Sequence, residues 1–522
     1  MKKDNIKRKV WLSEVLFAFC LATFFPLVAL AQGFEVVRGD CTPDLTDGDV
    51  TRGVRYRLPA PNKNWDANRI YKQLVILVSF RDVDFQMGNP EAIYDSIFNK
   101  KGYNKRNGVG CVADYFRDQS GGLFNLEFDV YGPIKLDTLA CPYTAPTDKT
   151  RNYGKDQFRN ATLEVIKQYP DIDYKQYDWD GDGKVEQVIY VHAGLSGNQG
   201  EGSYGYIWPN TGSFSSVTTP DGTKISNFTG SGELWKNNLG NCGIGTICHE
   251  FSHSLGLPDI YPTTSSAGYS VVDEWDLMDG GNFTNYGWCP PNYSPLEKML
   301  FGWLTPVELT ERASIKGLKP SADGGEVYQI NHSESEWLLL ENRQHEGWDL
   351  GIPGRGLVIY HVNYDRSVWQ NNTVNNDKSK RRYELVHADN MDYDVWDVAI
   401  GSKSPYRNKG RLNSAILSTS PYPWTTDSTT FVNNELTDTS VPAAKMNNPN
   451  ENGSTLLSKP ITNIRMSDDG LVSFDFMGGD HDGISSVVSN MPSRLVYNLQ
   501  GQQVLSPRKG LYIINRKKVF LY

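Results

Sequence analysis

The chain has 522 residues, of which 39% are hydrophobic and 22% charged, and its formal net charge is −9 at pH 7. A negative net charge argues against nucleic acid and anionic membrane surfaces as partners. A chain of this length is too long for one hydrophobic core, so we expect two or more domains.

The N-terminus has the pattern of a secretory signal peptide over residues 1–31. A basic start precedes the apolar stretch VLFAFCLATFFPLVALA, which ends in small residues before Gln32. A membrane anchor is the alternative, but the apolar run is short, contains Pro26 and is followed by no stop-transfer pattern. We therefore expect a secreted or cell-surface protein with no membrane span after signal removal. The sequence leaves its oligomeric state open.

Helical and strand patterns alternate between residues 69 and 305. The preceding segment, residues 32–68, is polar and is interpreted as a linker or the remnant of a pro-segment. Apolar runs or alternation predict strands, and apolar residues three and four apart predict helices. The strands are expected at 72–80, 123–132 and 185–194, and the helices at 109–119 and 161–169. This mixture predicts an α+β or α/β domain over residues 69–305.

Helical periodicity mostly disappears after residue 305. Strand-like runs separated by Asn-, Ser- and Asp-rich turns predict an all-β, sandwich-type domain over residues 306–477, in which 371–454 is mostly loop. Residues 478–522 are expected to form a small β module with turns at Gly501 and Gly510. The expected fold class is therefore a multidomain chain with an α+β domain, a β-sandwich-type domain and a small β tail.

Six cysteines remain after signal removal. An even number in an exported chain favours disulfides, although the sequence does not indicate the pairing, and buried free thiols are the alternative. None has the spacing of a four-cysteine zinc site. They are Cys41, Cys111, Cys141, Cys242, Cys248 and Cys289.

The stretch ICHEFSHSLGLPDIY carries the strongest chemical signal. On a helix, His249 and His253 project from one face and are spaced to bind one metal ion. Glu250 lies about 100° further round, which suits a general base acting on water at the metal. Gly256 lets the helix end and the chain turn, which brings Asp259 back as an oxygen ligand. Two imidazoles, one carboxylate and one open position make a catalytic zinc site.

Alternatives to this interpretation remain at several positions. Glu274 is the competing third ligand, and we favour Asp259 because the turn at Gly256 otherwise has no purpose. A buried amphipathic helix with two hydrogen-bonded histidines is the non-catalytic alternative. Further residues of interest are Cys248, interpreted as structural, Tyr261 and Tyr286 as candidate oxyanion donors, and His192 as a candidate border of the cleft.

Met278 precedes an Asp-Gly-Gly turn, as in the methionine turn of metzincins. The chain carries, in this order, the motifs KQLVILVSFRDVDF, CVADYF, DWDGDGKVEQVIYVHAG, HEFSHSLGLPD, WDLMDGG and LEKMLFGWL. In this turn and in the order of these motifs, the chain resembles the immune inhibitor A family of secreted bacterial metallopeptidases. The resemblance implies a metzincin-like zincin catalytic domain followed by β-rich domains. It also implies zinc on His249, His253 and Asp259, with Glu250 as base and Met278 beneath the metal.

The string DWDGDGKVE resembles the start of a calcium-binding loop. Asp178, Asp180 and Asp182 stand at positions 1, 3 and 5, the Lys184 carbonyl at 7 and Glu186 at 9. Position 12 is isoleucine instead of glutamate, which excludes an ordinary EF-hand. We expect a shortened calcium loop with a structural role, and an Asp/Gly-rich turn without metal is the alternative.

These observations predict a secreted zinc endopeptidase that cleaves proteins or peptides. A zinc amidohydrolase acting on small amides or peptidoglycan is one alternative, and a calcium-stabilised adhesin with a vestigial zinc site is another. The last residues, with YNLQGQ and GLYII, resemble the C-terminal sorting modules of proteins exported by Bacteroidetes, which implies secretion machinery as a partner. A plain β-hairpin cap is the alternative there.

Overall fold

The computed structural model describes residues 65–142, 152–198, 205–236, 239–263, 271–391, 417–425 and 432–480, together with four short strands beyond residue 484. The predicted signal peptide, most of the segment 32–68 and Cys41 lie outside the described residues. Among the described helices, none is both long enough and apolar enough to cross a membrane.

A six-stranded sheet organises the first part of the chain. Its order is β2-β1-β3-β5-β4, with β6 paired to β5. Strands β2, β1, β3 and β5 run parallel, whereas β4 and β6 are antiparallel to β5. The strands are β1 (Ile70–Phe80), β2 (Asn125–Leu136), β3 (Val188–Leu195), β4 (Asn210–Thr218), β5 (Lys224–Trp235) and β6 (Gly240–Asn241).

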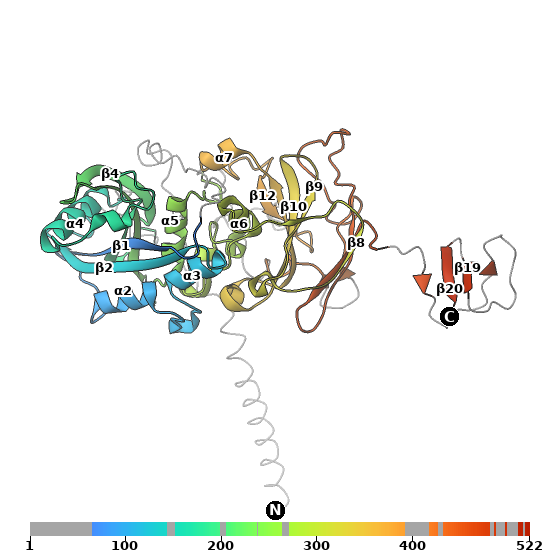
Figure 1. Ribbon diagram of the computed structural model, residues 1–522, viewed down its shortest axis with the longest axis horizontal. Coiled ribbons are helices and arrows are strands. Elements are labelled where there is room, and N and C mark those ends of the chain that lie inside the picture. Colours follow the sequence, from blue (N-terminus) through green and yellow to red (C-terminus); the bar gives the residue numbers. More distant parts are fainter. Residues whose placement is uncertain are drawn as a thin grey trace, which may run out of the picture.

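Helices cover both faces of this sheet (Figure 1). Because side chains alternate along a strand, Val75 and Leu77 of β1 pack with the helices α2, α3 and α5, while Leu74 and Ile76 pack with α4. Burial on both faces explains the nearly continuous apolar runs of β1 and β3. The helices are α2 (Pro90–Asn99), α3 (Val112–Gln119), α4 (Lys155–Gln168), α5 (Gly245–Leu255) and α6 (Pro295–Phe301). Short 3₁₀ turns are η1 (Lys105–Asn107), η2 (Tyr174–Tyr177), η3 (Asp273–Trp275) and η4 (Gly281–Gly287).

Two antiparallel-rich sheets dominate the second part. A five-stranded sheet has the order β12-β11-β10-β9-β7, and a three-stranded sheet has the order β15-β16-β8. Leu338, Leu340 and Ile359 of the first share a buried cluster with Ile461 and Phe474 of the second. The five-stranded sheet contains β7 (Val307–Glu308), β9 (Tyr328–Asn331), β10 (Glu336–Arg343), β11 (Gly356–Asn363) and β12 (Tyr383–Leu385). The three-stranded sheet contains β8 (Ala313–Leu318), β15 (Ile461–Met466) and β16 (Val472–Phe476).

Smaller elements complete this part. They are η5 (Ser321–Asp323), η6 (Gly347–Gly351), α7 (Arg366–Gln370), and the paired strands β13 (Trp424–Thr425) and β14 (Val432–Asn433). The tail forms a four-stranded sheet of order β17-β20-β19-β18, built from β17 (Ser485–Ser486), β18 (Val496–Tyr497), β19 (Gly510–Ile514) and β20 (Lys517–Leu521). Gly510, expected in a turn, is the first residue of β19.

The two parts share one hydrophobic core. The cluster that contains α2, α3 and α5 also contains Leu339 of β10, Tyr360 of β11 and Tyr383 of β12. Alternation along β10 therefore turns Leu338 and Leu340 towards the second sheet and Leu339 towards the first part of the chain. In Figure 1, α5 and α6 lie between the two sets of strands. The structure is thus a mixed α/β protein with several sheets. One hydrophobic core contains residues from both sides of the predicted domain boundary near residue 305.

The disulfide prediction is wrong for four of the cysteines. Cys111, Cys242, Cys248 and Cys289 are free and buried. The Cys111 thiol accepts a hydrogen bond from the Asp114 backbone N–H and caps α3. Burial raises the pKa of both Cys111 and Cys289 to about 12, so these thiols stay protonated. They serve as small apolar side chains in the core.

Candidate active site

Helix α5 places three of the predicted site residues together. His249, Glu250 and His253 are at most 3% exposed. The helix ends at Gly256, whose φ of 110° is strained for any residue with a Cβ and whose N–H donates to the carbonyls of Ser252 and His253. This turn redirects the chain towards Asp259, as the sequence predicts.

Asp259 meets both histidines. Its Oδ1 lies 3.3 Å from His249 Nε2 and 3.2 Å from His253 Nε2. Among the described residues, these three side chains form one of two groups whose ligand atoms lie within 4.8 Å of one another. A tetrahedral zinc site with bonds of about 2.0–2.1 Å separates its ligand atoms by about 3.3–3.4 Å. The two separations between Asp259 Oδ1 and the imidazole nitrogens therefore fit zinc.

Carbonyl groups orient both imidazole rings. His249 Nδ1 lies 2.8 Å from the Leu277 carbonyl oxygen, and His253 Nδ1 lies 2.7 Å from that of Leu257. Because a carbonyl only accepts, each Nδ1 carries a proton, and each Nε2 is the ring nitrogen that faces Asp259. Neither His249 Nε2 nor Asp259 Oδ1 makes a contact with the geometry of a hydrogen bond, although both atoms are buried. A cation between these atoms would satisfy all of them.

Asp259 is ionised in this setting. Burial alone would raise its pKa, but the two imidazoles hold the pKa well below its usual range. Its second oxygen, Oδ2, accepts a hydrogen bond of 2.7 Å from Asn372 Nδ2. Asn372 belongs to the region interpreted as loop from the sequence, and no local pattern marks it as part of this site.

Thr211, on the edge strand β4, holds the helix at Glu250. Its hydroxyl donates to the Glu250 carbonyl at 2.5 Å and lies 3.4 Å from Glu250 Oε2. No pattern in the sequence marks Thr211, because its spacing from the helix motif carries no signal. This hydrogen bond joins the turn of α5 that carries the Glu250 side chain to the edge strand β4 of the six-stranded sheet.

The turn around Met278 lies against the histidine helix and the Asp259 segment. Met278 is fully buried, and its carbonyl accepts from the Ile260 N–H at 2.8 Å. The preceding carbonyl, that of Leu277, is the one that orients His249. The Asp276 carboxylate accepts from the Met278 N–H at 2.8 Å and shapes the turn.

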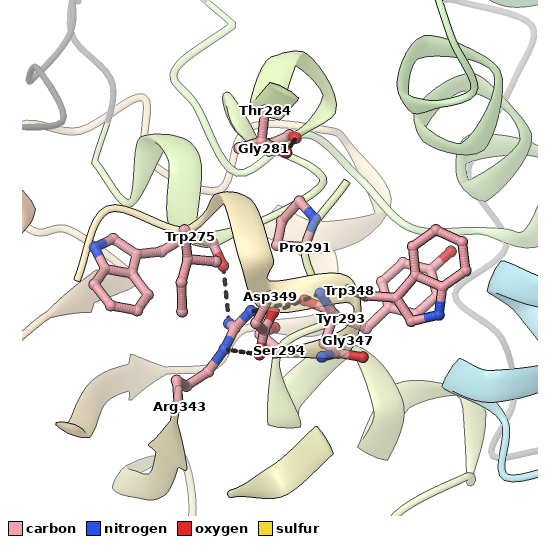
Figure 2. A network of polar contacts seen from close by, with 12 residues as sticks. Trp275, Gly281, Thr284, Pro291, Tyr293, Ser294, Arg343, Gly347, Trp348 and Asp349 are labelled. Carbon is pink, nitrogen blue, oxygen red and sulfur yellow. Dashed lines mark hydrogen bonds and ion pairs between the residues drawn. The ribbon is translucent and has the colours of Figure 1, made fainter. Parts of the chain in front are cut away.

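A buried arginine from β10 holds the start of the same turn. Figure 2 shows Arg343 reaching the Trp275 carbonyl and the Asp349 carboxylate. Arg343 Nη1 donates to Trp275 at 3.0 Å, and Nε donates to Asp349 Oδ2 at 2.9 Å. The second part of the chain thus supports the turn that orients His249.

The remaining candidates lie outside the histidine group. Glu274 is buried in η3 and is not among the converging ligand atoms. The Tyr261 ring stacks near His249 with a centroid separation of 6.5 Å, while the Tyr286 carbonyl accepts from Trp235 Nε1. His192 is buried in β3, and burial lowers its pKa to about 4, so it stays neutral.

The acidic loop before β3 forms the second group of converging ligand atoms. Asp178, Asp180 and Glu186 each place one oxygen within 4.8 Å of the others. Asp182 is not in this group, and its carboxylate contacts the Lys184 ammonium at 2.6 Å and the Lys184 N–H at 2.9 Å. Burial raises the pKa of Glu186 to about 7, and the neighbouring Asp180 adds to this effect.

The chain is similar to known metallopeptidases. Residues 58–301 match the model of the immune inhibitor A peptidase M6 catalytic domain. Immune inhibitor A of Bacillus thuringiensis subsp. alesti is 24% identical over 332 residues, covering 53% of this chain and 47% of the relative. Pre-pro-metalloprotease PrtV of Vibrio cholerae (strain M66-2) is 25% identical over 247 residues, covering 43% of this chain and 26% of the relative. The chain thus spans less than half the length of these curated relatives.

Proposed function

The chain belongs to the immune inhibitor A family of metallopeptidases through its residues 58–301, and from this premise we propose that it is a zinc-dependent endopeptidase. Its proposed substrates are the peptide bonds of extracellular proteins. The observation that carries the proposal is the convergence of His249, His253 and Asp259 beside Glu250 on the same helix. The catalytic part is proposed to be a metzincin-like zincin, with Met278 beneath the metal.

The chemistry follows from the donor set. Zinc held by two imidazoles and a carboxylate supplies a Lewis acid that acidifies water and polarises a carbonyl. Glu250, next to His249 on α5, takes the proton from the attacking water and returns it to the leaving amine. The carbonyls of Leu277 and Leu257 keep the Nδ1 atoms protonated, so that both Nε2 atoms point to the metal position. Thr211 holds the helix turn that carries Glu250.

The test compares cleavage of casein with zinc content in the chain from residue 32 onward. Glu250→Gln is expected to keep zinc and lower kcat/KM by about 10²–10⁴-fold, because only proton transfer is removed. Asp259→Ala is expected to lose zinc. Glu274→Gln is the matched control and is expected to keep both zinc and activity, because its carboxylate lies outside the histidine group.

Other results would favour another function. Zinc-loaded wild type that cleaves no protein but hydrolyses small amides would indicate an amidohydrolase, and one that cleaves neither would indicate a binding protein with a vestigial site. Loss of zinc from Glu274→Gln with retention in Asp259→Ala would reassign the third ligand.

The proposal extends to calcium and to export. Calcium on Asp178, Asp180 and Glu186 is supported by the closeness of their oxygens, and its role would be structural. Asp182 and the Lys184 carbonyl complete the predicted loop, although the Asp182 carboxylate contacts Lys184 here. Export by the signal peptide 1–31, and recognition of the C-terminal module by secretion machinery, belong to the same proposal.

A further inference from the structure

A six-residue segment after α7 lies along the chain that carries Asp259. We name residues 371–376, with the sequence NNTVNN, the asparagine strap. The Thr263 hydroxyl donates to the Asn372 carbonyl at 2.6 Å, and the Thr263 N–H donates to Asn376 Oδ1 at 2.7 Å. Asn375 Nδ2 donates to the Ile260 carbonyl at 2.8 Å. The strap is therefore hydrogen-bonded along the segment from Asp259 to Thr263.

Asn372 makes two reciprocal hydrogen bonds with Asp259. The Asp259 N–H donates to Asn372 Oδ1 at 2.7 Å, and Asn372 Nδ2 donates to Asp259 Oδ2 at 2.7 Å. The first bond fixes the orientation of the amide, because a backbone N–H requires an acceptor. The second bond then occupies Oδ2 and leaves Oδ1 facing the two imidazoles. Both side chains are at least 96% buried, so water does not compete for these bonds.

The position of the strap is set by the five-stranded sheet. Asn375 Oδ1 accepts from the backbone N–H groups of Arg382 at 2.9 Å and Tyr383 at 3.2 Å. Asn375 Nδ2 also donates to the Tyr383 carbonyl, at 2.9 Å. Val374 and Tyr383 are buried in the core shared by the two parts of the chain. Asn372 itself has a φ of 54°, a left-handed conformation that asparagine tolerates better than most residues.

We propose that Asn372 is a positioning residue for the third zinc ligand: it directs Asp259 Oδ1 alone to the metal, and the β-rich part of the chain thereby completes the zinc site. The inference rests on the proposed function. Without the Asn372 amide, the Asp259 carboxylate is free to rotate and the Asp259 N–H loses its acceptor. Removing a hydrogen-bond partner of a metal ligand typically lowers metal affinity or activity by about 10–100-fold. Asn372 lies 113 residues after Asp259, and beyond the matched catalytic domain.

The test uses the full chain from residue 32 with Asn372→Gly, since glycine adopts the same backbone conformation and removes only the amide. Asn372→Ser is a second variant, whose side chain ends one bond short of the amide oxygen and nitrogen that contact Asp259. Asn376→Ala is the control, because it removes a strap contact to Thr263 without touching the ligand. Zinc dissociation constants are measured by competition with a chromophoric chelator, and melting of the zinc-free proteins reports whether the fold is kept.

Both Asn372 variants are expected to bind zinc about 10–100-fold more weakly than wild type. The control is expected to bind zinc as tightly as wild type, because Asn376 contacts Thr263 and not the ligand Asp259. X-ray absorption of the zinc-loaded Asn372→Gly protein is expected to show an altered number or distance of oxygen ligands. Wild-type affinity in both Asn372 variants, or an equal loss in the control, would overturn the inference and leave the proposed function standing. Failure of the wild type to bind zinc would instead overturn the proposed function itself.

Discussion

Replacing Arg343 with methionine tests how strongly the second part of the chain supports the catalytic part. Arg343 is fully buried, and its guanidinium pairs with Asp349 and donates to the carbonyls of Trp275 and Asn292. Methionine fills similar volume without a donor. The change leaves the Asp349 carboxylate buried with one remaining donor, the Asn292 N–H at 2.9 Å.

The expected cost follows from these contacts. Removing one partner of a buried ion pair typically lowers the free energy of unfolding by about 3–5 kcal/mol, because the other charge stays buried. The two carbonyls that lose a donor contribute to this figure, at about 1 kcal/mol each. The double variant Arg343→Met with Asp349→Asn removes the charge at Asp349 and keeps an acceptor for the Asn292 N–H, while the second buried carboxylate beside Arg343, that of Glu341 at 3.6 Å, stays in both variants. We therefore expect it to recover about 2 kcal/mol of the loss.

Urea unfolding followed by tryptophan fluorescence, at fixed saturating zinc, measures these differences from the midpoint and the slope of the transition. The single variant is also expected to bind zinc more weakly, because the Trp275 carbonyl begins the turn that carries Leu277. A loss below about 1 kcal/mol, or a double variant no more stable than the single one, would refute the idea that a paired buried charge joins the two parts.

Two further predictions concern pH and calcium. Burial alone would lower the pKa of His361, but Glu336 and Glu384 raise it from 6.5 to about 9. Protonated His361 therefore contributes about 3 kcal/mol to the free energy of unfolding. This contribution is fully present below pH 6.5 and is lost as the pH rises through 9. Melting temperatures measured from pH 6 to 9.5 should fall more in wild type than in His361→Gln, and parallel curves would contradict this assignment. Calcium at 100 times its dissociation constant should raise the free energy of unfolding by about 2.7 kcal/mol, as measured by the calcium dependence of urea unfolding. The gain should vanish in Asp178→Asn, and an equal gain in that variant would place the ion elsewhere.

The sequence by itself determined the features that depend on neighbouring residues. The spacing of His249 and His253 sets both on one face of α5, and Gly256 permits the turn that returns Asp259, because helix geometry and a positive φ are local properties. The apolar run of β1 likewise predicted a buried strand. In the acidic loop, spacing indicated the converging oxygens of Asp178, Asp180 and Glu186.

Only the tertiary structure decided what surrounds these residues. Asn372 reaches Asp259 across 113 residues, Arg343 reaches Trp275 across 68, and Thr211 reaches Glu250 across 39. Such contacts depend on how sheets and helices pack, and a buried amide or arginine leaves no periodic signal in the sequence. The free state of Cys111 was decided in the same way, by burial in a core that lies beyond its sequence neighbours. Local spacing therefore predicted that His249, His253 and Asp259 converge, and long-range packing determined what holds them there.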